Sequence, residues 1–310
     1  MGEYKKQHTV TRKYLEGFAS DQNHGKFCQY KKSDGTFSWV DPKDATTANY
    51  IYSIQKPDGS WNHAVEHGWS VIESDAIPII PLICRQESLN DKQRYDFALH
   101  VAAMFLRPRH TIEHSLAGIN NFISKADNAL AFIKEHRSKL VQSHGEEEVS
   151  SLEIKIQNGD WEGSEMGAKI GRFRAWVDCL PTKATILVAM KWELWKSNKK
   201  NVFLTSDSPV STRRNGNWHD PGIVGIARED LNAEVYFPLD SRNFLVMKHS
   251  GNECRRSATK TRVIELNKLT IRMANKFIHS PFESGRIASL ILDNNKLPAP
   301  LTGRLLDAAQ

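Results

Sequence analysis

The sequence predicts an α+β fold, in which a helical N-terminal half packs on a mainly antiparallel sheet formed by the C-terminal half. Apolar residues recur at three- and four-residue spacing over 61–145, which indicates helices. Short runs of β-branched and aromatic residues, bounded by turn signals, gather in a mixed region over 150–310. Because strands and helices there lack regular βαβ spacing, α+β is favoured over a doubly wound sheet. We expect a single domain over residues 1–310, which begins with an N-terminal segment and hairpin over 1–60.

The composition is that of an ordinary globular protein, with 40% hydrophobic and 25% charged residues. No apolar run approaches the roughly 18 residues of a membrane span, and the N-terminus lacks the apolar core of a secretory signal. We therefore expect a cytoplasmic protein without a membrane segment. The four cysteines are far apart, which favours reduced thiols over disulfides or a zinc site. The net charge of +6 permits contact with nucleic acid without requiring it.

Two elements are predicted near the N-terminus. Apolar side chains between Val10 and Phe18 form the buried side of a short helix that docks on the core. Residues 26–30 and 36–40 are aromatic, partly alternating runs, and the segment 33–35 between them is typical of a hairpin turn.

The helical region contains a well-marked helix start. Asn90 or Asp91 can cap a helix that Pro108 ends or kinks, since proline lacks the N–H that a helix interior requires. Helical spacing then continues toward His136. Residues 144–148 are expected to form an exposed connection.

Signals alternate in the second half of the chain. Residues 151–156 fit either a short strand or the end of a helix. Residues 182–196 predict a helix with Trp192 and Trp195 near its end, and 263–279 predict another. β-branched and aromatic content predicts four strands, at 201–205, 223–226, 233–239 and 243–248.

The common catalytic motifs are missing from the sequence. It contains no Walker loop, Gly-x-Gly-x-x-Gly, Gly-x-Ser-x-Gly or His-Glu-x-x-His, which argues against P-loop, Rossmann, α/β-hydrolase and zincin chemistry. His63 and His67 beside Glu66 could share a helix face and bind a metal ion, although no third ligand lies nearby in sequence. A divalent metal ion is therefore one candidate cofactor.

The turn at 205–209, Thr-Ser-Asp-Ser-Pro, follows an apolar strand and is the most specific local feature. Asp and Ser side chains bind backbone N–H groups in turns and Pro fixes the following φ, so the motif needs no chemistry to explain it. Alternatively, Asp207 lies at the rim of a sheet, where it could bind a metal ion or orient a His or Arg side chain. Arg213 and Arg214 close by could then hold a phosphate group, with Ser206 beside them.

A further candidate region begins at the end of the capped helix. Arg109 and His114 have the Arg-x4-His spacing of HEPN ribonucleases, in which a cation stabilises charge on phosphorus and an imidazole transfers a proton. Arg107 at the helix end could meet a phosphate or a partner carboxylate. The alternative for Arg107 is a buried salt bridge to Glu66 or Glu73.

Histidine and basic residues supply the remaining candidates. His8 precedes the N-terminal helix, and imidazole titrates near neutral pH, so His8 could carry a proton in a cleft. The alternative is that this segment only docks on the core. Positive charge gathers in residues 191–214 and 255–262, which could contact nucleic acid or simply be solvated.

Several short motifs occur in an order that carries a resemblance. They are a His, Tyr-Leu and Phe-Ala arrangement at 8–19, an Arg at a helix end, the Ser-Asp-x-Pro turn, and an apolar strand ending in Pro-Leu at 237–239. In this order, over roughly residues 8–279, the chain resembles the bacterial family catalogued as domain of unknown function 4238. It departs from the family pattern at Thr11, where proline is more usual, and at Pro108, where threonine is. The resemblance implies no particular chemistry.

The leading hypothesis is an enzyme that acts on a phosphate-bearing substrate, as a nuclease-like effector in bacterial stress or phage defence. Its carboxylates would be Glu73 and Asp207, its acid–base group His8 or His114, and its phosphate clamp Arg107. The remaining candidate substrate-binding residues are Arg109, Ser206, Arg213 and Arg214. RNA or DNA is the expected partner, with a partner protein as the alternative. A non-catalytic binding module and a small-molecule enzyme with a pocket between helices and sheet are the rival hypotheses. The sequence determines neither substrate nor oligomeric state.

Overall fold

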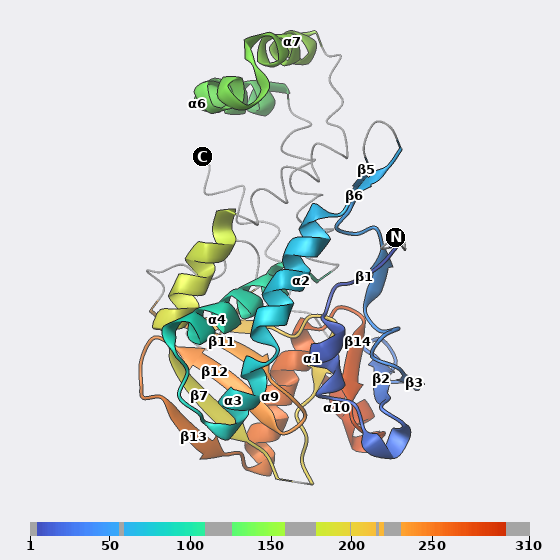
Figure 1. Cartoon of the computed structure of the whole chain (residues 1–310). Helices are drawn as coiled ribbons and strands as arrows, with labels where there is room; N and C mark the ends of the chain where they lie inside the picture. The colour runs from blue at the N-terminus through green and yellow to red at the C-terminus, as the bar shows by residue number, and fades with distance from the viewer. Residues whose placement is uncertain are drawn as a thin grey trace. The chain divides into compact units, whose positions relative to one another are not determined.

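The computed structural model describes residues 5–55, 59–108, 126–158, 178–198, 200–214, 217–219 and 231–295 (Figure 1). Contacts between residues divide the chain into two compact units, of which the first comprises residues 1–109 and 177–310 and the second residues 110–176. The prediction of one domain over residues 1–310 stays a prediction, because two compact units can belong to one folding domain.

The first unit contains both helices and strands, which confirms an α+β fold. Strands occur early as well as late, so they are not confined to the C-terminal half. Before α2 the elements are β1 (Lys6–His8), α1 (Arg12–Glu16), the 3-10 turn η1 (Asp21–Asn23), β2 (Phe27–Lys31), β3 (Phe37–Val40), β4 (Thr47–Asn49), β5 (Ile54–Gln55) and β6 (Trp61–Asn62). There follow α2 (Ala64–Ala76), α3 (Ile79–Arg85), α4 (Asp91–Leu106) and a helix over residues 178–189. The last elements are β7 (Lys191–Lys196), β8 (Thr205–Ser206), β9 (Ser211–Arg214), β10 (Asn217–His219), β11 (Ala233–Pro238), β12 (Asn243–Lys248), β13 (Cys254–Ser257), α9 (Lys260–Met273), β14 (Phe277–Ser280) and α10 (Gly285–Asn294).

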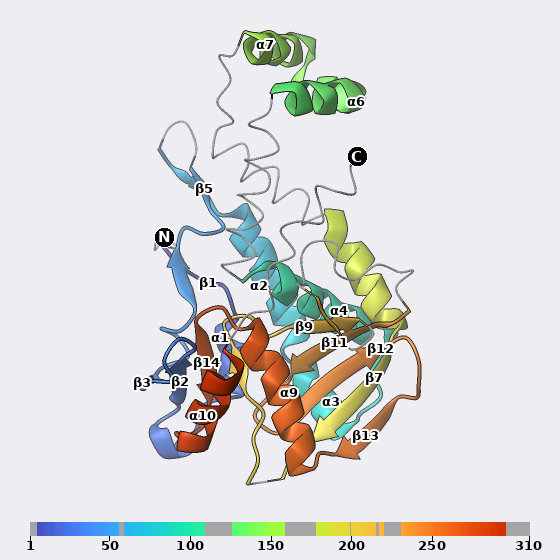
Figure 2. The same cartoon turned by 180° about the vertical axis from the view of Figure 1, so that it is seen from behind.

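A six-stranded sheet in the order β10-β9-β11-β12-β7-β13 forms the centre of this unit. Its strands pair antiparallel, except that β13 runs parallel to β7. Helix α4 covers one face and α9 covers the other, as the two opposite views show (Figures 1 and 2). Neighbouring residues of a strand point to opposite faces. Accordingly, Phe237 contacts Phe97 of α4, whereas Tyr236 belongs to the core cluster with Leu266 of α9.

A second sheet, in the order β3-β2-β14-β8, joins the N-terminal hairpin to the C-terminal part of the chain. The antiparallel pairing of β2 with β3 confirms the predicted hairpin. Strand β14 pairs with β2 on one side and with β8 on the other, so it connects residues far apart in sequence. Buried Tyr30, Leu204, Ile278 and Ile291 pack into one cluster beneath this sheet and α10.

The short helix α1 is fixed between the two sheets by a buried tyrosine. The Tyr14 hydroxyl lies 2.7 Å from Oγ1 of Thr205 on β8 and donates to the carbonyl of Pro238 on β11 at 2.8 Å. The apolar side chains of this segment, from Val10 to Phe18, are buried. This confirms that the segment docks on the core.

The boundaries of several helices differ from those predicted. The capping box between Asn90 and Gln93 confirms the predicted start of α4, which ends before Pro108. The predictions of helix over 182–196 and 263–279 were wrong at their C-terminal ends, where β7 and β14 lie instead. Pairing with neighbouring strands outweighs local helical spacing in both segments. In the predicted strand 201–205, only its last residue is in a strand, β8, and the predicted strand at 223–226 lies outside the described residues.

The second unit is described through a pair of helices, α6 (Ala126–His144) and α7 (Glu146–Gln157). Ile133, Val149 and Ile156 form their shared apolar core. Residues 151–156 are therefore helical. Residues 145–148 are exposed, as expected for the predicted connection over 144–148, but the connection itself is only Gly145, because α6 ends at His144 and α7 begins at Glu146. The φ of 87° at Gly145 makes the sharp reversal possible.

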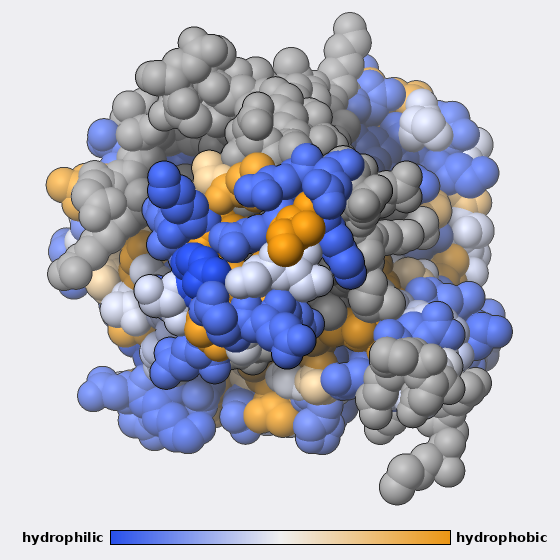
Figure 3. Space-filling model, turned by 90° about the horizontal axis from the view of Figure 1, so that it is seen from above, coloured by the Kyte–Doolittle hydropathy of each residue, from blue (hydrophilic) through white to orange (hydrophobic). Residues whose placement is uncertain are grey.

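The surface seen in Figure 3 is mostly hydrophilic, with small and separate hydrophobic spots among the described residues. Such scattered spots are normal for a folded protein in water. Among the residues that the structure describes, no helix is long and apolar enough to cross a membrane.

Candidate functional site

Three of the predicted site residues come together in the structure. His8 on β1, Glu73 on α2 and Arg107 at the end of α4 meet where these elements pack. The contacts of Asp207 are with other parts of the chain, and Arg109 and His114 lie outside the described residues. We refer to the side chains around Arg107 as the Arg107 cluster, which comprises His8, Thr11, Tyr52, Glu66, Trp69, Glu73, His100 and Arg107.

Arg107 is the largest fully buried side chain in the described part of the protein, with 2% of its surface exposed. It caps the C-terminus of α4, and its guanidinium points inward. Nη1 donates to Oε1 of Glu73, and Nη2 donates to the backbone carbonyl of His8 at 2.6 Å. A buried cation needs such acceptors, because the desolvation of an unpaired charge is very costly.

Two aromatic rings enclose the same guanidinium. Its central carbon lies 5.4 Å from the ring centre of Tyr52 and 5.5 Å from that of Trp69. The Tyr52 hydroxyl also donates to the backbone carbonyl of Arg107 at 2.8 Å. Planar guanidinium groups interact favourably with aromatic faces, so the rings stabilise the cation as well as exclude water.

Glu73 is the carboxylate that pairs with Arg107. Its Oε1 also accepts a hydrogen bond from the Thr11 hydroxyl at 2.8 Å. Burial acts to raise the pKa of Glu73, but the charge and hydrogen bond of Arg107, together with Thr11, outweigh it and lower the pKa. Glu73 is therefore ionised at neutral pH.

Glu66 lies two helical turns before Glu73 on the same face of α2 and behaves in the opposite way. Burial raises the pKa of Glu66 to about 7, with the charge of Arg107 opposing this shift and that of Glu73 adding to it. Its Oε2 is buried and accepts no hydrogen bond in the structure. One helix thus presents a carboxylate that is ionised and another that changes protonation near neutral pH.

Two histidines of the cluster are held in their neutral form. Burial lowers the pKa of His100 to about 4, and neither of its ring nitrogens has a hydrogen-bond partner. Burial also lowers the pKa of His8, opposed by the backbone of Pro42 and by Glu73. The Nε2 atom of His8 is buried and has no hydrogen-bond partner.

Asp207 has contacts that explain it as a structural residue. Its Oδ1 accepts the backbone N–H of Asn275 at 2.8 Å, and its Oδ2 accepts those of Lys276 at 2.8 Å and Phe277 at 3.1 Å. Within the same turn, Oγ of Ser206 accepts the backbone N–H of Ser208 at 3.1 Å. The bond of Ser206 is local, as the turn interpretation of the motif expects, whereas Asp207 binds a loop that is distant in sequence. None of these contacts involves the Arg107 cluster.

A buried lysine completes this second arrangement. Nζ of Lys32 donates to the carbonyls of Arg272 at 2.9 Å and Ala274 at 2.6 Å, at the C-terminus of α9. A cation is favourable there because the last carbonyls of a helix lack partners. Asp207 thus supplies acceptors and Lys32 supplies donors to one loop, which fixes the passage from α9 to β14.

The remaining predicted binding residues lie on strand β9. Arg213 pairs in register with Glu234 of β11 and Trp218 of β10, and only the backbone of Arg214 is described. Arg213 and Arg214 as phosphate ligands therefore stay a prediction.

The predicted metal pair also has another use in the structure. His63 precedes α2, and its Nδ1 lies 2.7 Å from Oγ of Ser53. Within the described ranges, no three His, Cys, Asp or Glu side chains are grouped so that they could hold a metal ion.

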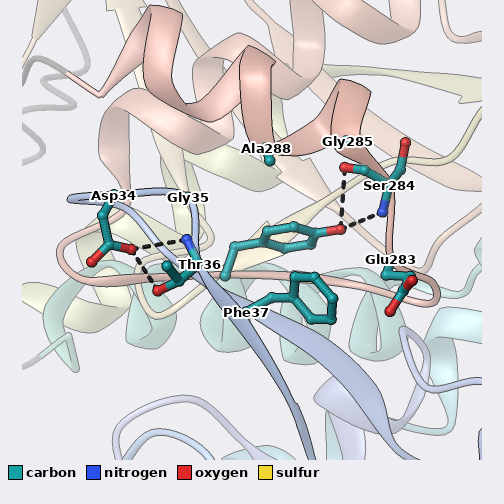
Figure 4. A pocket seen from close by; sticks show the side chains of 9 residues that line it. Asp34, Gly35, Thr36, Phe37, Glu283, Ser284, Gly285 and Ala288 are labelled. Carbon is teal, nitrogen blue, oxygen red and sulfur yellow. Dashed lines mark hydrogen bonds between the residues drawn. The ribbon is translucent and has the colours of Figure 1, made fainter.

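Among the hollows of the described surface, two are defined by their lining residues. One, of about 450 Å³, lies between the β2–β3 hairpin and the start of α10, with Asp34 and Glu283 at opposite ends (Figure 4). Asp34 is occupied there by the backbone N–H and hydroxyl of Thr36. The other, of about 340 Å³, lies against α1 and α3. No residue of the Arg107 cluster lines either hollow.

Comparison with family models matches residues 6–281 to the family described as "Protein of unknown function (DUF4238)". The chain belongs to this family. The comparisons with curated proteins and with solved structures give no match. The DUF4238 match covers His8, Glu73, Arg107 and Asp207, and it confirms the likeness expected from the order of the motifs.

Sequence reasoning missed some members of the cluster in this DUF4238 protein. His100 interrupts an apolar run and lies seven residues before Arg107, so the two share a helix face, which was a usable signal. Thr11 stands where the family pattern favours proline, and its hydroxyl supplies a hydrogen bond that proline cannot. Tyr52 gave no signal in sequence, and neither did Lys32, which lies outside the cluster, against the end of α9.

Asp207→Ala should destabilise the protein because three backbone N–H groups lose their acceptor and Lys32 loses the favourable charge of Asp207. We expect a loss on the order of 3 kcal/mol, which lowers Tm by roughly 6–10 °C. A thermal melt followed by circular dichroism measures this shift. The exposed Asp44→Ala is the control and should leave Tm within about 1 °C. An unchanged Tm in Asp207→Ala contradicts the structural role.

Arg107 and Glu73 should be strongly coupled in stability. Arg107→Leu leaves Glu73 in its buried site without its partner cation, at a cost of about 3–5 kcal/mol. In the double variant with Glu73→Leu the combined loss should be smaller than the sum of the single losses by about 1–3 kcal/mol. Urea unfolding of all four proteins measures the coupling. Additive losses contradict a direct interaction.

Proposed function

We propose that this DUF4238 protein is an enzyme that uses general acid–base chemistry at the Arg107 cluster. The proposal is supported mainly by one observation. Beside a single buried guanidinium, the pKa of Glu66 is raised and that of Glu73 is lowered. Paired groups whose pKa values are pushed apart are typical of acid–base sites. A purely structural ion pair needs Glu73 alone, and leaves the raised pKa of Glu66 without a use.

The residues of the cluster would have separate roles. Glu66, with a pKa of about 7, would give and accept the proton, because a group that titrates near the working pH does so most efficiently. Glu73 would remain ionised and, with Thr11, hold the Arg107 guanidinium in place. Arg107 would then stabilise negative charge that develops on the substrate. His8 would be a second proton carrier, as its position beside Arg107 and Glu73 allows.

The proposed substrate carries phosphate, and nucleic acid is the class we favour. Support comes from the net charge of +6 and from the basic segments on β7, β13 and the start of α9. On this basis we propose a nuclease-like role in bacterial stress or phage defence, in the cytoplasm. Asp207 is not needed in this proposal, because its acceptor oxygens are occupied by the backbone.

The rival proposal is a binding module without catalysis, in which the cluster is a structural polar network. It is favoured by the close enclosure of Arg107 and by the position of the two described hollows away from the cluster. The two proposals differ in what Glu66→Gln should do. Glutamine keeps the shape of the side chain but cannot transfer a proton.

Activity is the first test. The purified chain is incubated with labelled single-stranded RNA, single-stranded DNA and duplex DNA, each with and without Mg²⁺. We expect one of them to be cleaved or modified, with an apparent pKa near 7 in the rate profile. Glu66→Gln should lower the rate by roughly 10²-fold or more, whereas Asp75→Asn, an exposed change on α2, should not. Full activity in Glu66→Gln, or three unaltered nucleic acids, contradicts the proposal.

Stability against pH is the second test, and it needs no substrate. The pKa of Glu66 is about 7 in the folded protein and 4.5 in the unfolded chain. The folded state therefore binds more protons, so wild-type stability is lost as the pH rises from about 4.5 through about 7. Glu66→Gln removes this loss. Its Tm should equal that of the wild type near pH 4.5 and exceed it at pH 8.

The control for the second test is again Asp75→Asn, which should follow the wild type at every pH. An acid–base group that is kept at a cost in stability fits the trade-off between stability and activity. A Glu66→Gln variant with a lower Tm than the wild type at pH 8 indicates that the Glu66 carboxylate is structural, and it supports the binding module.

A further inference from the structure

The hollow against α1 and α3 has an apolar wall. Its volume of about 340 Å³ lies within the size range of small-molecule pockets. The apolar lining consists of Ile77, Ile80, Pro81 and Leu239. These residues come from the segment joining α2 to α3, from α3 itself and from the end of β11, so three separate elements build the wall.

One glycine allows these elements to approach closely. Gly17, at the end of α1, lines the hollow, and its carbonyl accepts the backbone N–H of Ser241 at 3.2 Å. A Cβ atom at Gly17 would lie 3.3 Å from Cβ of Asp240. A side chain at this position would therefore press on the turn after β11 and narrow the hollow.

Two cationic side chains stand at the edge of the same hollow. They are Lys13 on α1 and Arg85 at the end of α3. Arg85 is paired with Glu87 at 2.5 Å, but both side chains are more than 45% exposed, and such surface pairs are weak and exchange readily. No ion pair of Lys13 is given by the structure among the described residues.

The one carboxylate that lines the hollow is already used by the protein. Oδ1 of Asp240 accepts the backbone N–H groups of Arg242 at 2.6 Å and Asn243 at 2.8 Å. Its Oδ2 accepts the side-chain amide of Asn243 at 2.9 Å and the thiol of Cys84 at 3.4 Å. Asp240 therefore holds the turn in shape, and its oxygens are not open to a cationic ligand.

The thiol of Cys84 also lines the hollow, and its pKa depends on the charges around it. Burial raises the pKa of Cys84 well above its usual value and Asp240 adds to this, while the positive charges of Lys196 and Arg255 act against it. Cys84 is thus a neutral thiol and no nucleophile at neutral pH. Lys196 on β7 and Arg255 on β13 thus place two positive charges near Cys84. Lys13 and Arg85 line the hollow itself.

We propose that this hollow is a binding site for a small organic anion, in which the apolar wall holds the ligand's hydrocarbon part and Lys13 and Arg85 bind its oxyanion. A phosphate monoester and a carboxylate share this chemistry. The site is independent of the acid–base proposal, because no residue of the Arg107 cluster lines it. Thr11, which binds Glu73, lies directly before α1, which carries Lys13, and Ile77 lies directly after α2, which carries Glu73. An occupied site would therefore also support the elements that hold the cluster.

The test uses the fluorescent probe 1-anilinonaphthalene-8-sulfonate, which combines an apolar body with an anion, on the full chain. We expect saturable binding by the native protein with one site per chain. The uncharged analogue N-phenyl-1-naphthylamine should bind at least roughly fivefold more weakly, because it lacks the charge that Lys13 and Arg85 attract. Equal affinity for the two probes overturns the proposal.

Variants of the two cationic residues test whether the probe binds in this hollow. Lys13→Gln with Arg85→Gln should raise the Kd of the sulfonate probe at least roughly fivefold and leave that of the uncharged analogue unchanged. Lys26→Gln, an exposed lysine on another turn, is the matched control. Circular dichroism checks that each variant is folded. Unchanged binding in the double variant, or an equal loss in Lys26→Gln, overturns the proposal.

Competition then distinguishes the anions. Octyl phosphate displacing the probe at lower concentration than octanoate identifies a phosphate monoester as the preferred ligand, and the reverse order identifies a carboxylate. Inorganic phosphate alone should displace it poorly, because it lacks the apolar part. Displacement by inorganic phosphate as effective as that by octyl phosphate overturns the amphipathic site.

Discussion

A guanidinium removed from water must find acceptors for its N–H groups, and the packing around Arg107 follows from that requirement. Glu73 supplies a carboxylate from α2, the His8 carbonyl supplies an acceptor from β1, and Tyr52 binds the carbonyl of Arg107 itself. Three segments distant in sequence thereby meet Arg107 at the end of α4. Nε of Arg107 is buried without a hydrogen-bond partner, so the loss of a further acceptor would leave still more of the buried charge unpaired.

The same charge determines the chemistry that the cluster can perform. Burial acts to raise the pKa of both carboxyl groups, and the charge of Arg107 acts to lower both. At Glu73 the charge and direct hydrogen bond of Arg107 prevail, whereas at Glu66 burial prevails and the charge of Glu73 adds to the rise. The arrangement of Asp207 and Lys32 offers an instructive contrast. There the ammonium group of Lys32 and the carboxylate of Asp207 are both hydrogen-bonded to the backbone of the loop between α9 and β14, so the pair fixes the conformation of that loop. Buried charge alone therefore does not mark a site, and an unsatisfied oxygen such as Oε2 of Glu66 is the more telling sign.

How far the sequence could predict this structure depends on which interactions are local. The capping box at Asn90 and the β2–β3 hairpin were predictable, because their determinants lie within a few residues. The sequence also predicted a buried salt bridge from Arg107 to Glu66 or Glu73 as one of two readings, and the bond to Glu73 is present. Strands β7 and β14 were not predictable as strands, since helical spacing of apolar residues extends into both. Pairing with neighbouring strands of the sheet determines their conformation. Lys32 was missed for the same reason, because it binds carbonyls about 240 residues away.

The central claim is that two carboxyl groups of one helix have pKa values shifted in opposite directions, because only Glu73 binds the buried cation directly and burial prevails at Glu66. Carbon-13 NMR titration of the glutamate carboxyl groups tests it most directly, with resonances assigned from Glu66→Gln and Glu73→Gln. The account predicts that Glu66 titrates near pH 7 and Glu73 below its usual value of 4.5. Titration of both carboxyl groups together near pH 4.5 would contradict it.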